Sequence, residues 1–165
     1  MKSTKIFARA GVIAALYIVL SLITFPVASG VIQFRLSEAL TVLPLIFPEA
    51  VPALFVGCML SNLITGCTVI DIFLGGLVTL VAAILTYYCG KIFKNTFIKL
   101  FVGGIFPVIL NALFLPLIWL LCGIPIYFYL LQVLFLFISQ AVSVYAFGTP
   151  LYIGVEKAKK RYKNL

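Results

Sequence analysis

The sequence predicts an all-α integral membrane protein, folded as a six-transmembrane-helix bundle with both termini in the cytoplasm. Of its 165 residues, 64% are hydrophobic and only 10% are charged, and the mean hydropathy is +1.26. A soluble domain keeps about a quarter of its residues charged. The charges here are too few to cover a water-facing surface, so lipid must be part of the solvent.

Charged residues and Pro/Gly clusters divide the chain into six apolar segments within a single domain, 1–165. The expected spans lie near residues 6–25, 36–47, 50–66, 71–90, 100–122 and 126–154, and a basic cytoplasmic tail follows at 155–165. The first run is about 20 residues, long for a signal peptide, so we interpret it as a retained helix. Because Pro44, Pro48 and Pro52 crowd the junction of the short second and third spans, a broken or re-entrant pair is the alternative there. Gly148 with Pro150 is expected to bend the long sixth span.

The basic residues orient the chain. All of the twelve Lys and Arg residues except Arg35 lie at the two chain ends or in the segment 91–99. Six spans place these three regions on one side of the membrane, and the positive-inside rule makes that side cytoplasmic. Arg35 is then alone on the outer side, which suggests a local role. The alternative is a surface arginine near the lipid headgroups.

Polar residues inside a membrane domain are costly, so their positions are informative. In this orientation the inner halves of the spans are almost purely apolar. The polar candidates in the outer half are Glu38, Asn62, Asp71, Trp119 and Gln132, and those near the middle are Asn111 and Gln140. At about 100° per residue, Gln132, Ser139 and Ser143 share one helix face. The asymmetry predicts a pocket on the outer side, and interhelical hydrogen bonding without a ligand is the alternative for Gln140 and Ser143.

The two outer carboxylates define the expected ligand. Glu38 and Asp71 lie near helix N-termini, so each either caps a helix or binds a cation or the donor edge of a heterocycle. Carboxamides bind donors or acceptors, and aromatic rings stack on flat ligands. The inventory suits a flat, polar heterocycle with a cationic group. The aromatic candidates at this level are Phe34, Trp119, Tyr127 and Tyr129.

Several function classes are excluded. The chain has no histidine and its four cysteines form no CxxC pair, so we expect no metal site and no cofactor. The sequence also offers no nucleophile–base pair of the kind that would indicate an enzyme. The basic residues flank spans rather than forming a nucleic-acid surface. The chain also has no Walker loop, so a protein with an outer pocket needs a partner to drive uptake.

The first span offers a docking surface for such a partner. Ala10 and Ala14 lie on one side of the predicted helix, and Gly11 and Ala15 lie on another. Small residues four apart let helix backbones approach closely. One pair is expected to serve the protein's own bundle and the other a partner, although internal packing of both is equally compatible with the spacing.

Two sequence blocks carry a family resemblance. Residues 31–44 read VIQFRLSEALTVLP, and Asn62 is followed at 71–80 by DIFLGGLVTL. The chain resembles the queuosine-precursor transporter family, which comprises QueT-type substrate-binding (S) components of energy-coupling-factor (ECF) transporters. The resemblance covers nearly the whole chain, and the first block is the more specific.

The resemblance implies a bacterial plasma-membrane protein that captures a 7-deazaguanine from outside: 7-aminomethyl-7-deazaguanine, its nitrile precursor or queuine. It also implies a transmembrane coupling subunit and two ATP-binding subunits as partners. The family docks through an Ala-x-x-x-Ala surface on the first span. Ala10/Ala14 matches this pattern outright and Gly11/Ala15 nearly does, so both remain candidates.

We expect one of Glu38 and Asp71 to accept from the guanine-like N–H edge and the other to pair with an aminomethyl cation. Arg35 would close the site or donate to the ring carbonyl. The full set of candidate substrate-binding residues is Gln33, Phe34, Arg35, Glu38, Asn62, Asp71, Asn111, Trp119, Gln132 and Gln140. The alternatives are an S component for another vitamin-like heterocycle, of thiamine or pyridoxine type, and a small bundle subunit without a transport role.

Overall fold

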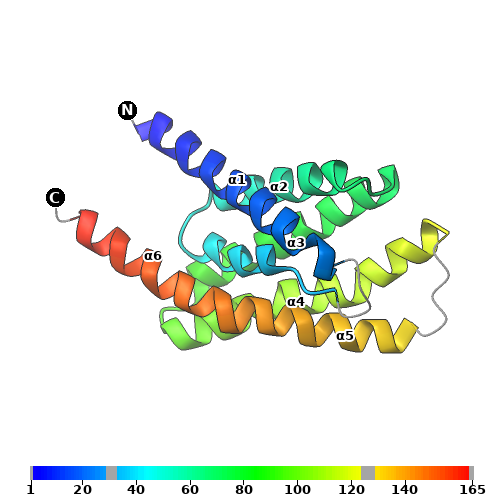
Figure 1. Cartoon of the computed structure of the whole chain (residues 1–165). Coiled ribbons are helices and arrows are strands. Elements are labelled where there is room, and N and C mark those ends of the chain that lie inside the picture. The colour runs from blue at the N-terminus through cyan, green and yellow to red at the C-terminus, as the bar shows by residue number, and fades with distance from the viewer. Residues whose placement is uncertain (1, 29–32, 124–128, 164–165) are drawn as a thin grey trace.

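The computed structural model of the chain describes residues 2–28, 33–123 and 129–163, and these residues are helical apart from short connections. The elements follow one another as a bundle (Figure 1). Their bounds are α1 Lys2–Ala28, the 3₁₀ helix η1 Leu36–Leu45, α2 Ala50–Ile64, α3 Val69–Ile92, α4 Thr96–Leu121, α5 Tyr129–Ala141, the π-helix η2 Val142–Phe147 and α6 Gly148–Lys163.

Four helical stretches are long and apolar enough to cross a membrane: Ser3–Pro26, Val69–Ile92, Thr96–Leu121 and Tyr129–Arg161. Two shorter apolar helices, η1 and α2, complete the set. The predicted all-α membrane fold is therefore confirmed. The number of spans and the cytoplasmic location of the termini stay predictions, although Figure 1 places the two chain ends at the same end of the molecule.

The second predicted span, 36–47, is a ten-residue 3₁₀ helix rather than an α-helix. Pro44 lies inside it and removes a backbone donor, and Pro48 prevents its continuation as an α-helix. Every residue from Ser37 to Leu45 is buried. Backbone that is not α-helical is tolerated at membrane depth only where protein surrounds it, and Figure 1 shows η1 in the middle of the bundle.

Two glycines let neighbouring helices contact η1 directly. A Cβ atom at Gly90 of α3 would lie 2.8 Å from the Leu45 carbonyl oxygen, and one at Gly148 of α6 would lie 3.0 Å from the Ala39 carbonyl oxygen. Any side chain at these positions would push the helix away. The backbones of α3 and α6 thus enclose opposite ends of η1.

The last long helix is continuous but irregular. The expected bend near Gly148 and Pro150 corresponds to a π-helical segment just before them, with the Gly148 N–H bonded to the Ser143 carbonyl oxygen. Pro150 has no N–H to bond the Ala146 carbonyl oxygen, so the α-helical pattern is interrupted there. The expected tail after residue 154 is helical to Lys163. The first residues of the predicted sixth span, 126–128, lie outside the described residues.

Candidate functional site

A buried carboxylate joins three elements at the start of η1. Glu38 is 1% exposed. Tyr17 of α1 donates its hydroxyl to Glu38 Oε1 at 2.7 Å, and Asn111 of α4 donates its amide to Oε2 at 2.9 Å. Both carboxylate oxygens are therefore engaged by the protein, and α1, η1 and α4 are held at one level.

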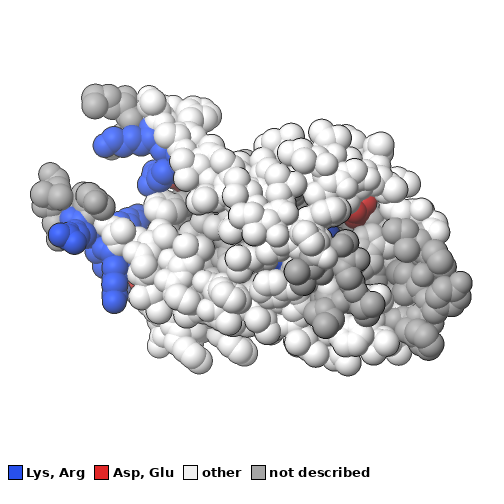
Figure 2. All heavy atoms as spheres, viewed as in Figure 1, with Lys and Arg blue, Asp and Glu red and all other residues white. Residues whose placement is uncertain are grey.

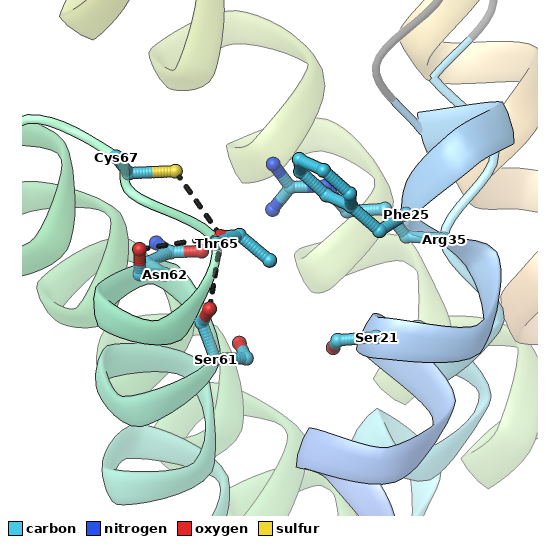
Figure 3. A pocket seen from close by; sticks show the side chains of 7 residues that line it. All are labelled: Ser21, Phe25, Arg35, Ser61, Asn62, Thr65 and Cys67. Carbon is cyan, nitrogen blue, oxygen red and sulfur yellow. Dashed lines mark hydrogen bonds between the residues drawn. The ribbon is translucent and has the colours of Figure 1, made fainter.

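A polar cavity lies on the α1–α2 side of η1. Its volume is about 50 Å³, and it is lined by Ser21, Phe25, Arg35, Ser61, Asn62, Thr65 and Cys67. Figure 3 shows the Arg35 guanidinium extending over the cavity beside Phe25 and toward the turn that carries Cys67. Three elements supply the walls: α1, the residue preceding η1, and α2 with its following turn. A space of this size holds a few waters, whereas ligand pockets measure about 300–1,000 Å³.

Asp71 and Asn62 converge over Gly75 of α3. A Cβ atom at Gly75 would lie 3.3 Å from Asn62 Nδ2 and 3.5 Å from Asp71 Oδ1. A methyl group at Gly75 would therefore contact both side chains, which are 5% and 6% exposed. Because Arg35 and Asn62 share the cavity and Asp71 contributes to the field at the Arg35 guanidinium, these three groups form one charged cluster.

Asp71 does not cap its own helix. The Thr68 hydroxyl does so, accepting from the Asp71 backbone N–H at 3.3 Å. The Asp71 carboxylate instead interacts with the Cys67 thiol, and burial raises the pKa of that thiol, so it is neutral at physiological pH. A thiol is a weak donor. Asp71 therefore keeps more acceptor capacity than Glu38, each of whose oxygens already accepts one strong hydrogen bond.

Gln140 and Ser143 are buried polar residues without partners. Gln140 is 1% exposed and Ser143 is fully buried, yet neither amide atom of Gln140 nor the Ser143 hydroxyl finds a hydrogen-bond partner among the described residues. Gln140 lies one helical turn after Leu136 on the same side of α5. Leu136 packs against Ala112 and Leu115 of α4. Such unpaired groups are costly and call for a ligand, a water or a strain-bearing role.

The residues just before η1 are bound to the last long helix. The Gln33 carbonyl oxygen accepts from the Ser139 hydroxyl at 3.1 Å, and Gln33 has a positive φ of 44°. The Phe34 ring packs edge-on against Phe147 at a centroid distance of 6.1 Å. These contacts position the segment that leads into Arg35.

The other predicted candidates lie apart from the cavity. Trp119 packs in an apolar cluster with Leu115, Ile118 and Leu136. Gln132 is half-buried, and its amide oxygen has no partner among the described residues. The Tyr129 hydroxyl donates to the Leu113 carbonyl oxygen; Tyr127 lies outside the described residues. The structure therefore gathers Arg35, Glu38, Asn62, Asp71 and Asn111 around η1, but it does not bring Trp119 or Gln132 to them.

Sequence reasoning missed Tyr17, Ser21 and Cys67. A signal was present, because Tyr17, Ser21 and Thr24 follow the i, i+4, i+7 spacing of one face in an otherwise apolar first span. The cysteines had been interpreted as buried apolar side chains, which fits Cys58 and Cys89. No three His, Cys, Asp or Glu residues come together as a metal-binding group within residues 2–28, 33–123 and 129–163.

The structure distinguishes the two small-residue pairs on α1. Ala10 and Ala14 are partly buried against the core, and a Cβ atom at Gly57 of α2 would lie 3.2 Å from the Ala14 carbonyl oxygen. Gly11 and Ala15 are exposed. The first pair thus supports the protein's own packing, and the second faces outward.

Comparison with known proteins identifies the family of this chain. The sequence profile of the family described as "QueT transporter" matches residues 7–157. The chain belongs to the QueT transporter family. QueT membership confirms the predicted family. Together with the membrane-spanning helices, it makes this a multi-pass protein of the cell membrane.

A curated relative supports this assignment. The chain is 35% identical over 85 residues to the queuosine precursor transporter QueT of Lactococcus lactis subsp. cremoris (strain MG1363). The match covers 49% of this chain and 50% of that relative, so the chain spans about half the length of the curated protein it matches. No solved structure matches the chain.

Proposed function

We propose that this chain is the substrate-binding S component of an ECF uptake transporter and captures a queuosine precursor of the 7-deazaguanine class. The observation that carries the proposal is the cluster of half-buried Arg35 with buried Asn62 and Asp71 beside a polar cavity. Membership of the QueT family and the name of the Lactococcus relative support the substrate class.

The cluster is complementary to a guanine-like ring. Its ring N–H and amino groups need an acceptor, its carbonyl oxygen needs a donor, and a carboxamide serves either kind of group. Asp71 would accept from the N–H edge, Arg35 would donate to the carbonyl oxygen, and Asn62 would bind an adjoining polar atom. Asp71 is favoured over Glu38 for this contact because each Glu38 oxygen already accepts a hydrogen bond, from Tyr17 or from Asn111, whereas Asp71 faces only a weak thiol donor.

Glu38 would act as a positioning residue. It fixes η1 against α1 and α4, and Arg35 comes directly before η1. A ligand group held within about 0.5 Å of its ideal position needs such support. We therefore expect Glu38 to influence affinity through Arg35 rather than through the ligand.

Binding requires the cavity to enlarge. A bicyclic ring does not fit in about 50 Å³, and Arg35 and Phe25 are the two long side chains that cover this space in Figure 3. We propose that both swing aside and that Arg35 then closes on the ligand. Gln140, with an unpaired donor and an unpaired acceptor, would bind the deeper part of the ring.

We further propose that the chain crosses the membrane six times with both ends in the cytoplasm and works with a transmembrane coupling subunit and two ATP-binding subunits. The outward-facing Gly11 and Ala15 support a docking face on α1, since they leave room for a partner helix to approach closely. Ala10 and Ala14 are already used against the protein's own core.

Calorimetry on the purified, detergent-solubilised full chain tests the substrate. The titrants are 7-aminomethyl-7-deazaguanine, guanine and thiamine. We expect one-to-one binding of the deazaguanine, no binding of thiamine, and an affinity reduced about tenfold or more by Asp71→Asn, equal to about 1.4 kcal/mol. Glu156→Gln is the matched control, because Glu156 lies on α6 and pairs with Lys160. Binding of thiamine alone would replace the substrate class, and unchanged affinity in Asp71→Asn would remove Asp71 from the site.

Docking is tested separately by co-purification with the coupling and ATP-binding subunits. Gly11→Leu should abolish the complex while leaving ligand binding intact. Gly154→Leu is the control, since both glycines have open space around the missing side chain. If the Gly11→Leu chain co-purifies as well as the control chain, this face of α1 does not dock.

A further inference from the structure

Two cations from opposite ends of the chain contact one aromatic ring. The Arg9 guanidinium carbon lies 4.7 Å from the centre of the Phe47 ring, and Lys159 Nζ lies 4.9 Å from the same centre. Arg9 belongs to α1, Lys159 to α6, and Phe47 to the turn between η1 and α2. The ring therefore holds together the basic ends of two helices that are otherwise separated by most of the sequence.

Each cation is further fixed by the same turn. Arg9 Nε lies 2.8 Å from Glu49 Oε1, and Lys159 Nζ donates to the Ile46 carbonyl oxygen at 3.0 Å. The Lys159 contact uses one of its donors, and the Arg9 contact is an ion pair. A guanidinium has five N–H donors and an ammonium has three, so both keep donors for a shared anion. The Arg9 side chain is 45% exposed, and Lys159 is exposed as well.

The surroundings carry a strong excess of positive charge. Lys5 precedes Arg9 by one turn, and Lys157, Lys160 and Arg161 flank Lys159. Figure 2 shows these basic residues on two projecting ends that face one another across a gap. The nearby acids are already paired, Glu49 with Arg9 and Glu156 with Lys160. The gap is thus lined by cations without free acids among the described residues.

Apolar side chains beside the cations indicate the class of ligand. Ile6 is 43% exposed and lies three residues before Arg9, on the same face of α1. The cations also stand at the ends of two candidate membrane spans, Ser3–Pro26 and Tyr129–Arg161. A phosphate with an acyl chain below it uses both features, because the headgroup meets the cations and the chain covers the exposed Ile6 side chain.

We infer that Arg9 and Lys159, held in place by Phe47, form a discrete binding site for the phosphate of an anionic phospholipid between the ends of α1 and α6. The site lies away from the Arg35 cavity and does not depend on the proposed transport function. It ties a lipid headgroup to the turn that follows η1. The bound lipid would stabilise the packing of the two terminal helices against this turn.

The thermal unfolding midpoint of the detergent-purified full chain tests the site. Phosphatidylglycerol and phosphatidylcholine are added separately as mixed micelles. We expect phosphatidylglycerol to raise the midpoint by about 3 °C more than phosphatidylcholine at a roughly tenfold excess over its dissociation constant. Lys159→Gln should remove at least half of this difference, and Phe47→Leu, which keeps an apolar side chain, should do the same.

Lys94→Gln is the matched control. It removes one exposed charge from the other basic segment, 91–99, whereas the cations over the Phe47 ring are Arg9 and Lys159. This variant should keep the full difference between the two lipids. An equal loss in Lys94→Gln and Lys159→Gln would show diffuse attraction and overturn the site, as would equal stabilisation by the two lipids. Inorganic phosphate is added alone as a further arm, and an equal rise with it would replace the lipid by a soluble anion.

Discussion

The two ends of η1 differ in how their polar groups are satisfied. At its start, Asp71 has only a weak thiol donor and Gln140 has no partner among the described residues. Just after its end, Glu49 is paired with Arg9, and the Ile46 carbonyl oxygen accepts from Lys159. Anchoring contacts therefore occur at both ends of η1, through Glu38 at its start and through Lys159 after its end. The unused hydrogen-bonding capacity of Asp71 and Gln140 supports the proposed ligand site.

The largest expected effect comes from Glu38→Ala. This change leaves the Tyr17 hydroxyl and the Asn111 amide unpaired in the interior, at a cost of about 1–3 kcal/mol for each group. The unfolding midpoint of the detergent-purified protein should fall accordingly. Glu38→Gln keeps an acceptor and should lose less. Equal midpoints for Glu38→Ala and the unchanged protein would show that the buried carboxylate does not hold the three elements together.

Gly90→Ala tests the packing around the end of η1. The new methyl group would lie within 3 Å of the Leu45 backbone, so α3 must move away from η1 at a cost of about 1–3 kcal/mol. Gly154→Ala is its control, since nothing lies within 4 Å of that position. The control should leave the midpoint unchanged or slightly raised. If both variants behave alike in thermal unfolding, α3 and η1 are not closely packed.

Gln140→Leu separates stability from binding at the other end. Because it removes a buried amide without partners, it should raise the free energy of unfolding by about 1 kcal/mol and still weaken deazaguanine binding. Thermal unfolding and calorimetry on the same sample measure the two effects. A loss of stability would instead show that Gln140 makes an interhelical hydrogen bond with a structural role.

The smallest effect is expected for Arg9→Gln. The Arg9 side chain is 45% exposed, so its ion pair with Glu49 should contribute less than about 1 kcal/mol, and less still at high salt. Unfolding midpoints at low and high ionic strength measure this contribution. A large loss that persists in salt would mean that the pair is shielded from solvent in the folded protein.

Much of the fold followed from the sequence, because hydropathy and charge spacing directly report contact with lipid. The long apolar stretches appear as α1, α3, α4 and the last long helix. The close packing of η1 against Gly90 and Gly148 did not follow, since it joins residues far apart in the sequence. The prolines at the junction of the second and third predicted spans indicated no more than that a regular α-helix was doubtful there.

Part of the candidate site could likewise be predicted from the sequence. Arg35, Asn62 and Asp71 were singled out because charged and amide groups are rare within membrane segments. Tyr17 was missed because a tyrosine in an apolar helix has a hydroxyl whose partner, Glu38, is distant in sequence. The contact of Arg9 and Lys159 with one ring depends on tertiary packing between residues far apart, for which a single sequence gives no signal.

The contact between Gly148 and Ala39 has a consequence for biosynthesis. The ribosome makes η1 early, but the helix that covers its Ala39 carbonyl is made last. Until α6 has been made, the irregular backbone of η1 is incompletely enclosed by protein. The membrane interior has no water to hydrogen-bond an exposed carbonyl group, so such exposure is costly. A nascent chain that stops before residue 148 lacks this cover, so η1 is fully enclosed only when the last helix has been made.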